Sequence, residues 1–145
     1  MIFFSSALEL VLEIKIIMNK LIIDMANEKI FLMIITKDDI YNITKENTKI
    51  NYEKLTLIIA GFLNSNNLKI NDIHKMYVNK GPGSFAGIRN SLSVVKAFNV
   101  TKKIDFYCYS FEDFKEEKDV KYENIPKLCD KFKIKKNLIN PNYLS

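Results

Sequence analysis

The sequence predicts an α/β fold in which helices pack on a mixed β-sheet. Three strand-like runs come first, and helix-like and strand-like runs then alternate, which gives the predicted order βββαβαβα. The length of 145 residues suits one domain with a single core, and 48% of the residues are hydrophobic. No low-complexity stretch interrupts the chain, so we expect a globular protein rather than a disordered one.

The first three elements are predicted to form an antiparallel meander. LIID (21–24) is an apolar run that ends in a carboxylate, and KIFLMIIT (29–36) is rich in isoleucine. After a polar turn at 37–39, IYNIT (40–44) alternates apolar with polar residues. Such short, isoleucine-rich or alternating runs are typical of strands.

Two longer helices are predicted from apolar residues at spacings of three and four. The first covers residues 52–62 with Asn51 as its N-cap, and the second continues from a cap at Ser84 through residue 98. The apolar positions that set these spacings are Leu55, Ile58, Ile59 and Phe62, and then Phe85, Ile88, Leu92, Val95 and Phe98.

Two further strands are expected on either side of the second helix, at 74–80 and 105–109. After them, Ser110 and Asp113 resemble a capping pair that starts another helix through Phe114. The ribonuclease H-like, actin-type fold has this order of elements.

Charge gives weak support for nucleic-acid binding. The 22 lysines and arginines exceed the 17 acidic residues by five, but Arg89 is the only arginine, and arginine dominates specific phosphate and base contacts. A solvated lysine surface is the favoured interpretation. The same holds for the C-terminal cluster of Lys131, Lys133, Lys135 and Lys136, with contact to an RNA backbone as the alternative.

The sequence suggests neither a metal centre nor a disulfide framework. Cys108 and Cys129 lie far apart without CxxC spacing, and His74 is the only histidine. A reduced, cytoplasmic protein is therefore expected. Residues 1–17 are apolar, but they lack a basic n-region and a cleavage site and are too short to span a membrane. We predict that they are an upstream extension before Met18.

KGPGSFAGIR (80–89) contains three of the four glycines and allows three interpretations. A phosphate cradle is one, but the glycine spacing fits neither the Walker A nor the dinucleotide pattern. A nucleophile at Ser84 is another, although the serine is displaced by one position from GxSxG. In the third, Gly81 and Gly83 supply unusual backbone angles and Gly87 lets another backbone come close.

Two segments, LIIDMA (21–26) and GPGSFAGIR (81–89), together with the helix between them, resemble the TsaB (YeaZ) branch of the glycoprotease-like (Gcp/M22), actin-type family. The pattern of that family runs roughly IDT, then H-S-x-x-L, then GPGSFTGLR. The resemblance covers about residues 19–118 and implies the N-terminal lobe of the ribonuclease H-like, actin-like ATPase fold.

The resemblance also implies a scaffold role. Subunits of this type pair with a related TsaD-like catalytic subunit and act with a TsaE-like ATPase in making threonylcarbamoyladenosine in tRNA, which they contact indirectly. No cofactor is expected on this chain alone, and ATP only within a complex. The pairing surface is expected on the two helices, at Leu55, Ile58, Ile59, Phe62, Phe85, Ile88, Arg89, Leu92 and Lys96, with Gly87 permitting close helix contact.

The chain departs from the family pattern at polar positions. IDT becomes Asp24-Met25-Ala26, and the threonine of GSFTG is Ala86. The first helix lacks the HxxxH pair of the catalytic relatives, so no metal site and no catalytic residue are predicted. Asp24, Gly83 and Ser84 stay as weak candidates for cofactor binding. Asp24 has no visible partner in the sequence, and a structural use is favoured for it.

The predicted organisation has three parts. Residues 1–17 are the extension and 18–118 the lobe, while 119–145 hold a last short helix (125–132) and an extended tail (141–145). Family members continue with a second lobe, which we expect to be largely missing here. Two other functions are left open: a glycoprotease-like peptidase or hydrolase, and a degenerate homodimer without a role in tRNA modification.

Overall fold

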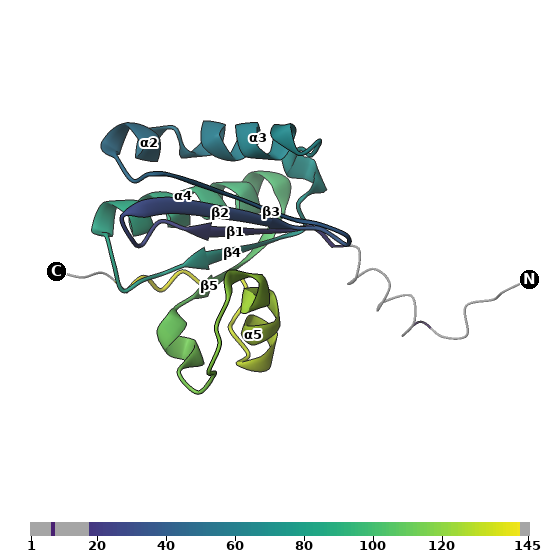
Figure 1. Ribbon diagram of the computed structural model, residues 1–145, viewed down its shortest axis with the longest axis vertical. Coiled ribbons are helices and arrows are strands. Elements are labelled where there is room, and N and C mark those ends of the chain that lie inside the picture. The colour runs from purple at the N-terminus through teal and green to yellow at the C-terminus, as the bar shows by residue number, and fades with distance from the viewer. Residues whose placement is uncertain (1–6, 8–17, 143–145) are drawn as a thin grey trace, which may run out of the picture.

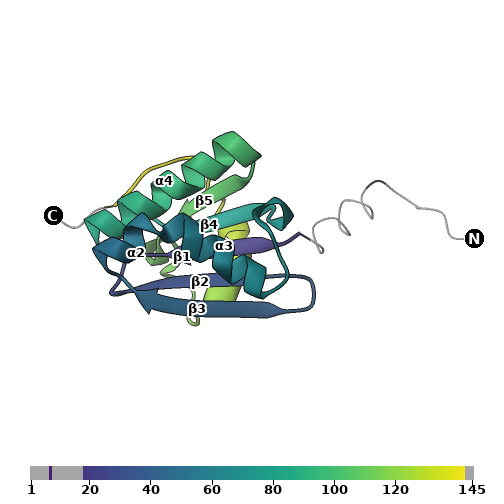
Figure 2. The ribbon, with the colours of Figure 1, turned by 90° about the horizontal axis from the view of Figure 1, so that it is seen from above.

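Five strands form one mixed sheet at the centre of the molecule. The computed structural model describes Ala7 and residues 18–142, and the sheet has the order β3-β2-β1-β4-β5. Its strands are β1 (Lys20–Asp24), β2 (Lys29–Ile35), β3 (Ile40–Glu46), β4 (Lys75–Asn79) and β5 (Asp105–Tyr109). The first three are antiparallel neighbours, whereas β4 pairs in parallel with both β1 and β5 (Figure 2). The predicted meander and mixed sheet are confirmed.

Helices cover both faces of this sheet. One face carries α2 (Lys49–Glu53), α3 (Leu55–Ser65) and α4 (Phe85–Lys102), and the other carries α5 (Ile125–Lys131) (Figure 1). Short 3-10 helices occur at Ile70–Asp72, Phe111–Phe114 and Tyr122–Asn124. The order of strands and helices agrees with the prediction, including the short last helix.

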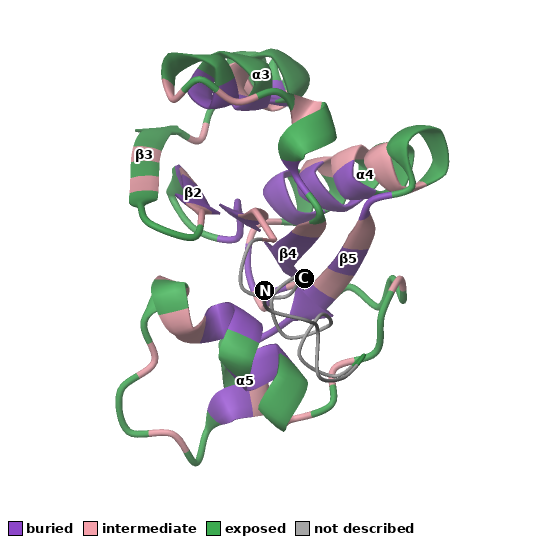
Figure 3. Cartoon of the chain, turned by 90° about the vertical axis from the view of Figure 1, so that its right-hand side faces the viewer, coloured by how far each residue is buried: buried purple, intermediate pink, exposed green. Residues whose placement is uncertain are grey.

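Burial on both faces explains why β1 is a continuous apolar run. Leu21 and Ile23 pack with the α3 and α4 layer, Ile22 between them packs with the α5 layer, and all three are fully buried. Successive side chains of a strand point to opposite faces, so a strand covered on both sides needs apolar residues at each position. The buried stripe of α4 faces this sheet, and its outward side is exposed (Figure 3).

The first helix begins earlier than predicted and is interrupted. Thr48, rather than Asn51, is the N-cap, and its hydroxyl accepts a hydrogen bond from the backbone N–H of Asn51. The helix breaks at Lys54, where the backbone has φ −101° and ψ 10°, and α3 follows directly. Asn51 instead donates from Nδ2 to the backbone carbonyl of Glu46 at 2.7 Å. Threonine and asparagine are both common N-caps, so residue type alone could not choose between them.

Two other helix boundaries differ from the prediction. α4 extends beyond residue 98 to Lys102 and ends where Lys103 adopts a left-handed conformation with φ 56°. The capping pair is present, because the Ser110 N–H donates to the Asp113 carboxylate at 2.9 Å. It starts only a single 3-10 helix, however, and not the predicted α-helix.

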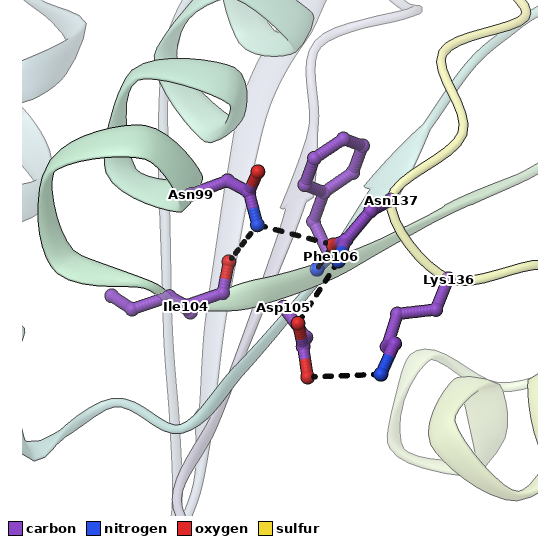
Figure 4. A network of polar contacts seen from close by, with 6 residues as sticks. All are labelled: Asn99, Ile104, Asp105, Phe106, Lys136 and Asn137. Atoms are coloured by element: carbon purple, nitrogen blue, oxygen red, sulfur yellow. Dashed lines mark hydrogen bonds and ion pairs between the residues drawn. The ribbon is translucent and has the colours of Figure 1, made fainter.

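The chain after α5 covers the outer edge of β5 (Figure 4). Lys136 forms an isolated bridge with Tyr107, and the Asn137 N–H donates to the carbonyl of Phe106 at 2.8 Å. The Asn137 side chain accepts from the Phe106 N–H at 2.9 Å and donates to the Asp105 carboxylate at 3.0 Å. These bonds occupy backbone groups that a second protein could otherwise pair with.

Two predictions concern segments at the ends. Residues 1–17, apart from Ala7, and residues 143–145 lie outside the described residues, so the predicted extension and most of the predicted tail stay predictions. Within the part of the chain that is described, no helix is long and apolar enough to cross a membrane.

Candidate functional site

The glycine segment joins β4 to α4 and packs directly on the chain that leaves β1. A Cβ atom at Gly83 would lie 2.2 Å from the carbonyl oxygen of Ala26, and one at Gly87 would lie 2.0 Å from that of Met25. The Ser84 N–H donates to the same Ala26 carbonyl at 2.9 Å. These contacts leave no room for side chains, so glycine is required by the close approach of two backbones. Gly87 thus contacts the β1 end and not a second helix.

Gly81 has a different reason for being glycine. Its φ of +108° is a conformation that residues with a side chain rarely adopt, and a Cβ there would lie 2.1 Å from the carbonyl oxygen of Asn142. The Gly81 N–H donates to Oδ1 of Asn79 at 2.9 Å. The structural interpretation of the segment therefore accounts for Gly81, Gly83 and Gly87.

Asp24, at the end of β1, is buried and is bonded to three donors. Oδ1 accepts from the backbone N–H of Ala26 at 3.0 Å. Oδ2 accepts from Nδ2 of Asn79 at 3.0 Å and from the hydroxyl of Tyr122 at 2.6 Å. The expectation that Asp24 lacks a partner is corrected, and its structural use is explained: the carboxylate joins the end of β1, the end of β4 and the C-terminal segment.

Tyr122 reaches this position from the 3-10 helix before α5. Its ring stacks on Phe31 with centroids 4.0 Å apart and meets Phe111 edge to face at 5.7 Å. Burial raises the pKa of the Tyr122 hydroxyl above its ordinary value, and the negative charge of Asp24 raises it further. The hydroxyl therefore stays protonated at neutral pH and acts as a hydrogen-bond donor to Asp24.

An open cleft of about 840 Å³ lies beside this joint. Its lining brings together the three weak cofactor candidates, Asp24, Gly83 and Ser84, along with Tyr122 and the rim residues Glu28 and Lys29. The Lys29 ammonium is paired with Glu46. The cleft thus presents carboxylates and a paired lysine, which is an unfavourable setting for phosphate groups.

Ser84 serves as the N-cap of α4. Its Oγ accepts from the Gly87 N–H at 3.2 Å and lies 3.5 Å from the Tyr52 hydroxyl. His74 is at the opposite end of β4, where its Nδ1 accepts from the Asn19 N–H at 3.0 Å. A serine nucleophile needs a base within hydrogen-bond reach, and His74 is not in that position.

Potential ligands for metals are scattered in the same way. Among the residues that the structure describes, no three His, Cys, Asp or Glu side chains gather closely enough to hold an ion. Burial raises the pKa of the Cys108 thiol to about 12 and that of Cys129 above its ordinary value. Both thiols are therefore protonated at neutral pH.

The C-terminal lysine cluster is partly engaged in ion pairs. Lys131 contacts Glu117, and the Nζ of Lys136 lies 3.7 Å from Asp105. Both pairs are on the exposed surface, where an ion pair contributes little to stability. This setting fits the solvated surface that we favoured from the sequence.

Most residues of the predicted pairing surface point into the core of this chain and not toward solvent. Five of its nine residues are buried in the core of this chain: Leu55, Ile59, Phe62, Ile88 and Leu92. The spacing of three and four was correctly taken as an apolar helix face, but that face packs on the sheet. These five residues cannot form an outward surface, and this part of the prediction is wrong.

The other four residues are nearer to the outside. Phe85 is 52% exposed, Arg89 and Lys96 are exposed, and Ile58 is half-buried. Arg89 and Phe85 line a shallow hollow of about 330 Å³ at the start of α4. Sequence periodicity correctly included Phe85 but missed the exposed Leu57, which falls outside the apolar stripe of α3.

A separate and largely apolar groove of about 290 Å³ lies between α3 and the later part of α4. Ala60, Leu63, Leu68 and Phe98 are among its lining residues, and Lys69 is the charged one. Ala60 is exposed on the flank of α3 that faces α4. We call this groove and the hollow at Phe85 and Arg89, which share no lining residue, the α3–α4 face.

Comparison with solved structures identifies the fold. YeaZ from Pseudomonas aeruginosa superposes with a TM-score of 0.60 at 15% sequence identity, over 65% of this chain and 44% of that one. The fold is that of YeaZ. A crystal structure described as an uncharacterized protein with similarity to peptidase YeaZ from Pseudomonas aeruginosa gives the same TM-score, identity and coverage. The predicted ribonuclease H-like lobe and the predicted resemblance to YeaZ are confirmed.

Sequence comparison adds a partial family match. Residues 46–110 match the family described as TsaD, tRNA N6-adenosine threonylcarbamoyltransferase. This stretch contains α2, α3, the glycine segment, α4 and β5. No protein of curated function matches the sequence. The chain spans less than half the length of the two chains that it superposes on.

Proposed function

We propose that this protein is a non-catalytic scaffold subunit that docks on a TsaD-like catalytic subunit and supports threonylcarbamoyladenosine formation in tRNA. One observation carries the proposal: the residues that match the TsaD family, 46–110, build the outer helices and the glycine segment of a YeaZ fold. In this proposal the protein acts in the cytoplasm, and a TsaE-like ATPase joins the same assembly.

The docking surface that we propose is the α3–α4 face. It combines an apolar groove with an aromatic ring at Phe85 and a guanidinium at Arg89, and aromatic and arginine side chains dominate the energetics of protein interfaces. The positive charges of Arg89 and Lys69 in its lining favour a partner with acidic residues around an apolar helix.

A scaffold role fits the chemistry of the cleft better than catalysis does. Asp24 already accepts three hydrogen bonds, one of them from the hydroxyl of Tyr122, whose side chain covers the carboxylate. Ser84 caps α4 and has no histidine beside it, which disfavours the peptidase alternative. The residues in the cleft do not suit a nucleotide on this chain alone, so we assign any ATP chemistry to the complex.

Binding to the TsaD-like subunit of the same organism tests the proposal. Ala60→Asp places a charge in the apolar groove, and we expect the dissociation constant to rise at least about thirtyfold, which corresponds to about 2 kcal/mol. Phe85→Ala should weaken binding in the same way. Val100→Asp is the matched control, because Val100 is 67% exposed and lines neither the groove nor the hollow at Phe85.

The functional readout is the threonylcarbamoyladenosine content of total tRNA after depletion of the protein. We expect the content to fall, to be restored by the wild-type chain and the Val100→Asp variant, and not to be restored by Ala60→Asp. Unchanged modification after complete depletion would refute the proposed role. Binding that is insensitive to both Ala60→Asp and Phe85→Ala would refute the proposed surface.

A further inference from the structure

We propose that two copies of this chain pair through the open edge of β3, so that their sheets join into one continuous sheet. The two edges of the sheet differ: the edge at β5 is covered by Lys136 and Asn137, as Figure 4 shows, whereas β3 is the last strand on the other side. No described segment of the chain pairs with the outer side of β3. Open strand edges are templates for pairing with another strand.

Two backbone bonds show which groups of β3 point outward. Thr36 donates its N–H to Asp39 at 2.9 Å, and Asn47 donates its N–H to Glu28 at 3.2 Å. In an antiparallel ladder, bonded and non-bonded pairs alternate. In the observed register, Tyr41, Ile43 and Lys45 therefore bond to β2. The N–H and C=O groups of Ile40, Asn42, Thr44 and Glu46 face away from it.

One of these outward carbonyls is already occupied. The Glu46 oxygen accepts from Nδ2 of Asn51 at 2.7 Å, so the available edge runs from Ile40 to Thr44. Its centre is Asn42. A second copy of the same edge, running antiparallel and related by a two-fold axis at Asn42, makes three hydrogen-bonded pairs: Asn42 with Asn42, and Ile40 with Thr44 twice.

The side chains of β3 are complementary in this register. Tyr41 lies opposite Ile43 of the other copy, an aromatic and β-branched pair that is favourable across strands. Lys45 lies opposite Asp39 of the other copy, so each end of the paired strands carries one ion pair. Both residues are exposed in the single chain. A two-fold axis at Ile43 would instead place Tyr41 opposite Lys45 and require the occupied Glu46 carbonyl.

The adjacent groove provides space and apolar surface for the second copy. A hollow of about 710 Å³ lies between β3 and α3, and its lining includes Tyr41, Ile43, Leu57 and Gly61. Leu57 is 70% exposed, and a Cβ at Gly61 would meet nothing within 4 Å. A two-fold axis perpendicular to the sheet keeps both α3 helices on one face, so Leu57 of each copy turns toward the other. The self-complementary charges at Asp39 and Lys45 identify a second copy of this chain as the occupant.

The pairing leaves the other flank of α3 free. Ala60 and Phe98 line the groove on the α4 side, whereas Leu57 and Gly61 line the groove on the β3 side. The proposed dimer therefore does not depend on the docking of a TsaD-like subunit, and each can fail without the other.

Sedimentation equilibrium of the full chain over a concentration series tests the pairing. The wild type should be dimeric. Asn42→Pro removes a backbone N–H that points away from β2. An edge strand tolerates proline at such a position, so the variant should fold with an unchanged circular dichroism spectrum. We expect its dimer dissociation constant to rise at least about tenfold, because the two central bonds are lost.

A charge exchange tests the register without relying on proline. Asp39→Lys alone and Lys45→Asp alone place like charges opposite each other and should weaken the dimer, and the double variant should recover it. Phe85→Asp, on the α3–α4 face, should leave the dimer unchanged. A wild type that stays monomeric throughout overturns the proposal. So does a dimer that survives Asn42→Pro and shows no recovery in the charge exchange, or one that Phe85→Asp dissociates.

Discussion

Removing one hydroxyl from Tyr122 tests whether the C-terminal segment is a structural part of the lobe. Tyr122→Phe keeps the ring that stacks on Phe31 and removes the donor that lies 2.6 Å from Oδ2 of Asp24. Asp24 is only 1% exposed, so solvent does not replace the lost donor freely. The substitution therefore isolates one hydrogen bond between segments that are far apart in the sequence.

The expected loss follows from what Asp24 retains. Its carboxylate keeps the Ala26 N–H and the Asn79 amide, both at 3.0 Å, and loses one of three donors. A hydrogen bond to a charged group contributes about 1.5–3 kcal/mol net. We expect the free energy of unfolding to fall by about 2 kcal/mol and the Tm to fall by about 8 °C, at about 4 °C for each kcal/mol.

Urea unfolding at neutral pH, followed by circular dichroism, measures this loss. Tyr52→Phe is the matched control, because its hydroxyl lies 3.5 Å from Ser84 Oγ, too far for a strong bond. We expect the control to change the free energy of unfolding by less than about 0.5 kcal/mol. If Tyr122→Phe loses no more than the control, Asp24 does not hold the C-terminal segment, and its assigned structural role is wrong.

Three further predictions follow from the same packing, all measured by urea unfolding. Ile88→Ala should lower the free energy of unfolding by about 2–5 kcal/mol, because Ile88 is fully buried in the core. A loss of partner binding at unchanged stability would contradict that placement. Gly87→Ala should strongly lower the free energy of unfolding, because its Cβ would lie 2.0 Å from the Met25 carbonyl oxygen. Gly61→Ala should instead stabilise α3 by about 0.5–1 kcal/mol. Equal effects of the two substitutions would contradict the assigned contacts. Burial raises the pKa of Tyr77 and Tyr109 above the ordinary value, so the folded state keeps protons that the unfolded state releases. Stability should begin to fall above about pH 8.5, where the thiols of Cys108 and Cys129 ionise in the unfolded state only, and should fall more steeply above about pH 10, where Tyr77 and Tyr109 add up to about 2.7 kcal/mol per pH unit. A profile that does not steepen up to about pH 11 would contradict the burial of both hydroxyls.

Local patterns were sufficient to predict the fold. The isoleucine-rich runs became β1 and β2, and the spacing of Leu55 and Ile59 or of Ile88 and Leu92 placed the two helices correctly. The same spacing could not show what each helix face contacts. An apolar stripe that packs on a sheet and one that docks on another protein have the same period. In this small chain the stripes of both helices pack on the sheet.

The joint at Asp24 was beyond the reach of sequence spacing for a different reason. Its donors Asn79 and Tyr122 are 55 and 98 positions away in the chain. Neither belongs to a recognisable motif, and only the fold brings them to the end of β1. The glycine segment was easier to interpret, because close backbone approach is a property of glycine wherever it occurs, and Gly83 and Gly87 both show it.

The C-terminal segment decides which surfaces stay open for partners. It covers Asp24 with Tyr122 and closes the β5 edge with Asn137, so that carboxylate and that edge are both engaged within the chain. Among the described residues, two open surfaces adjoin α3 on its two flanks, toward α4 and toward β3. A charge at Ala60 acts on the first flank and a charge at Leu57 on the second. Because the two hollows lie on different sides of α3 and share no lining residue, a two-fold dimer through β3 would leave both α3–α4 faces free, each to bind one TsaD-like subunit.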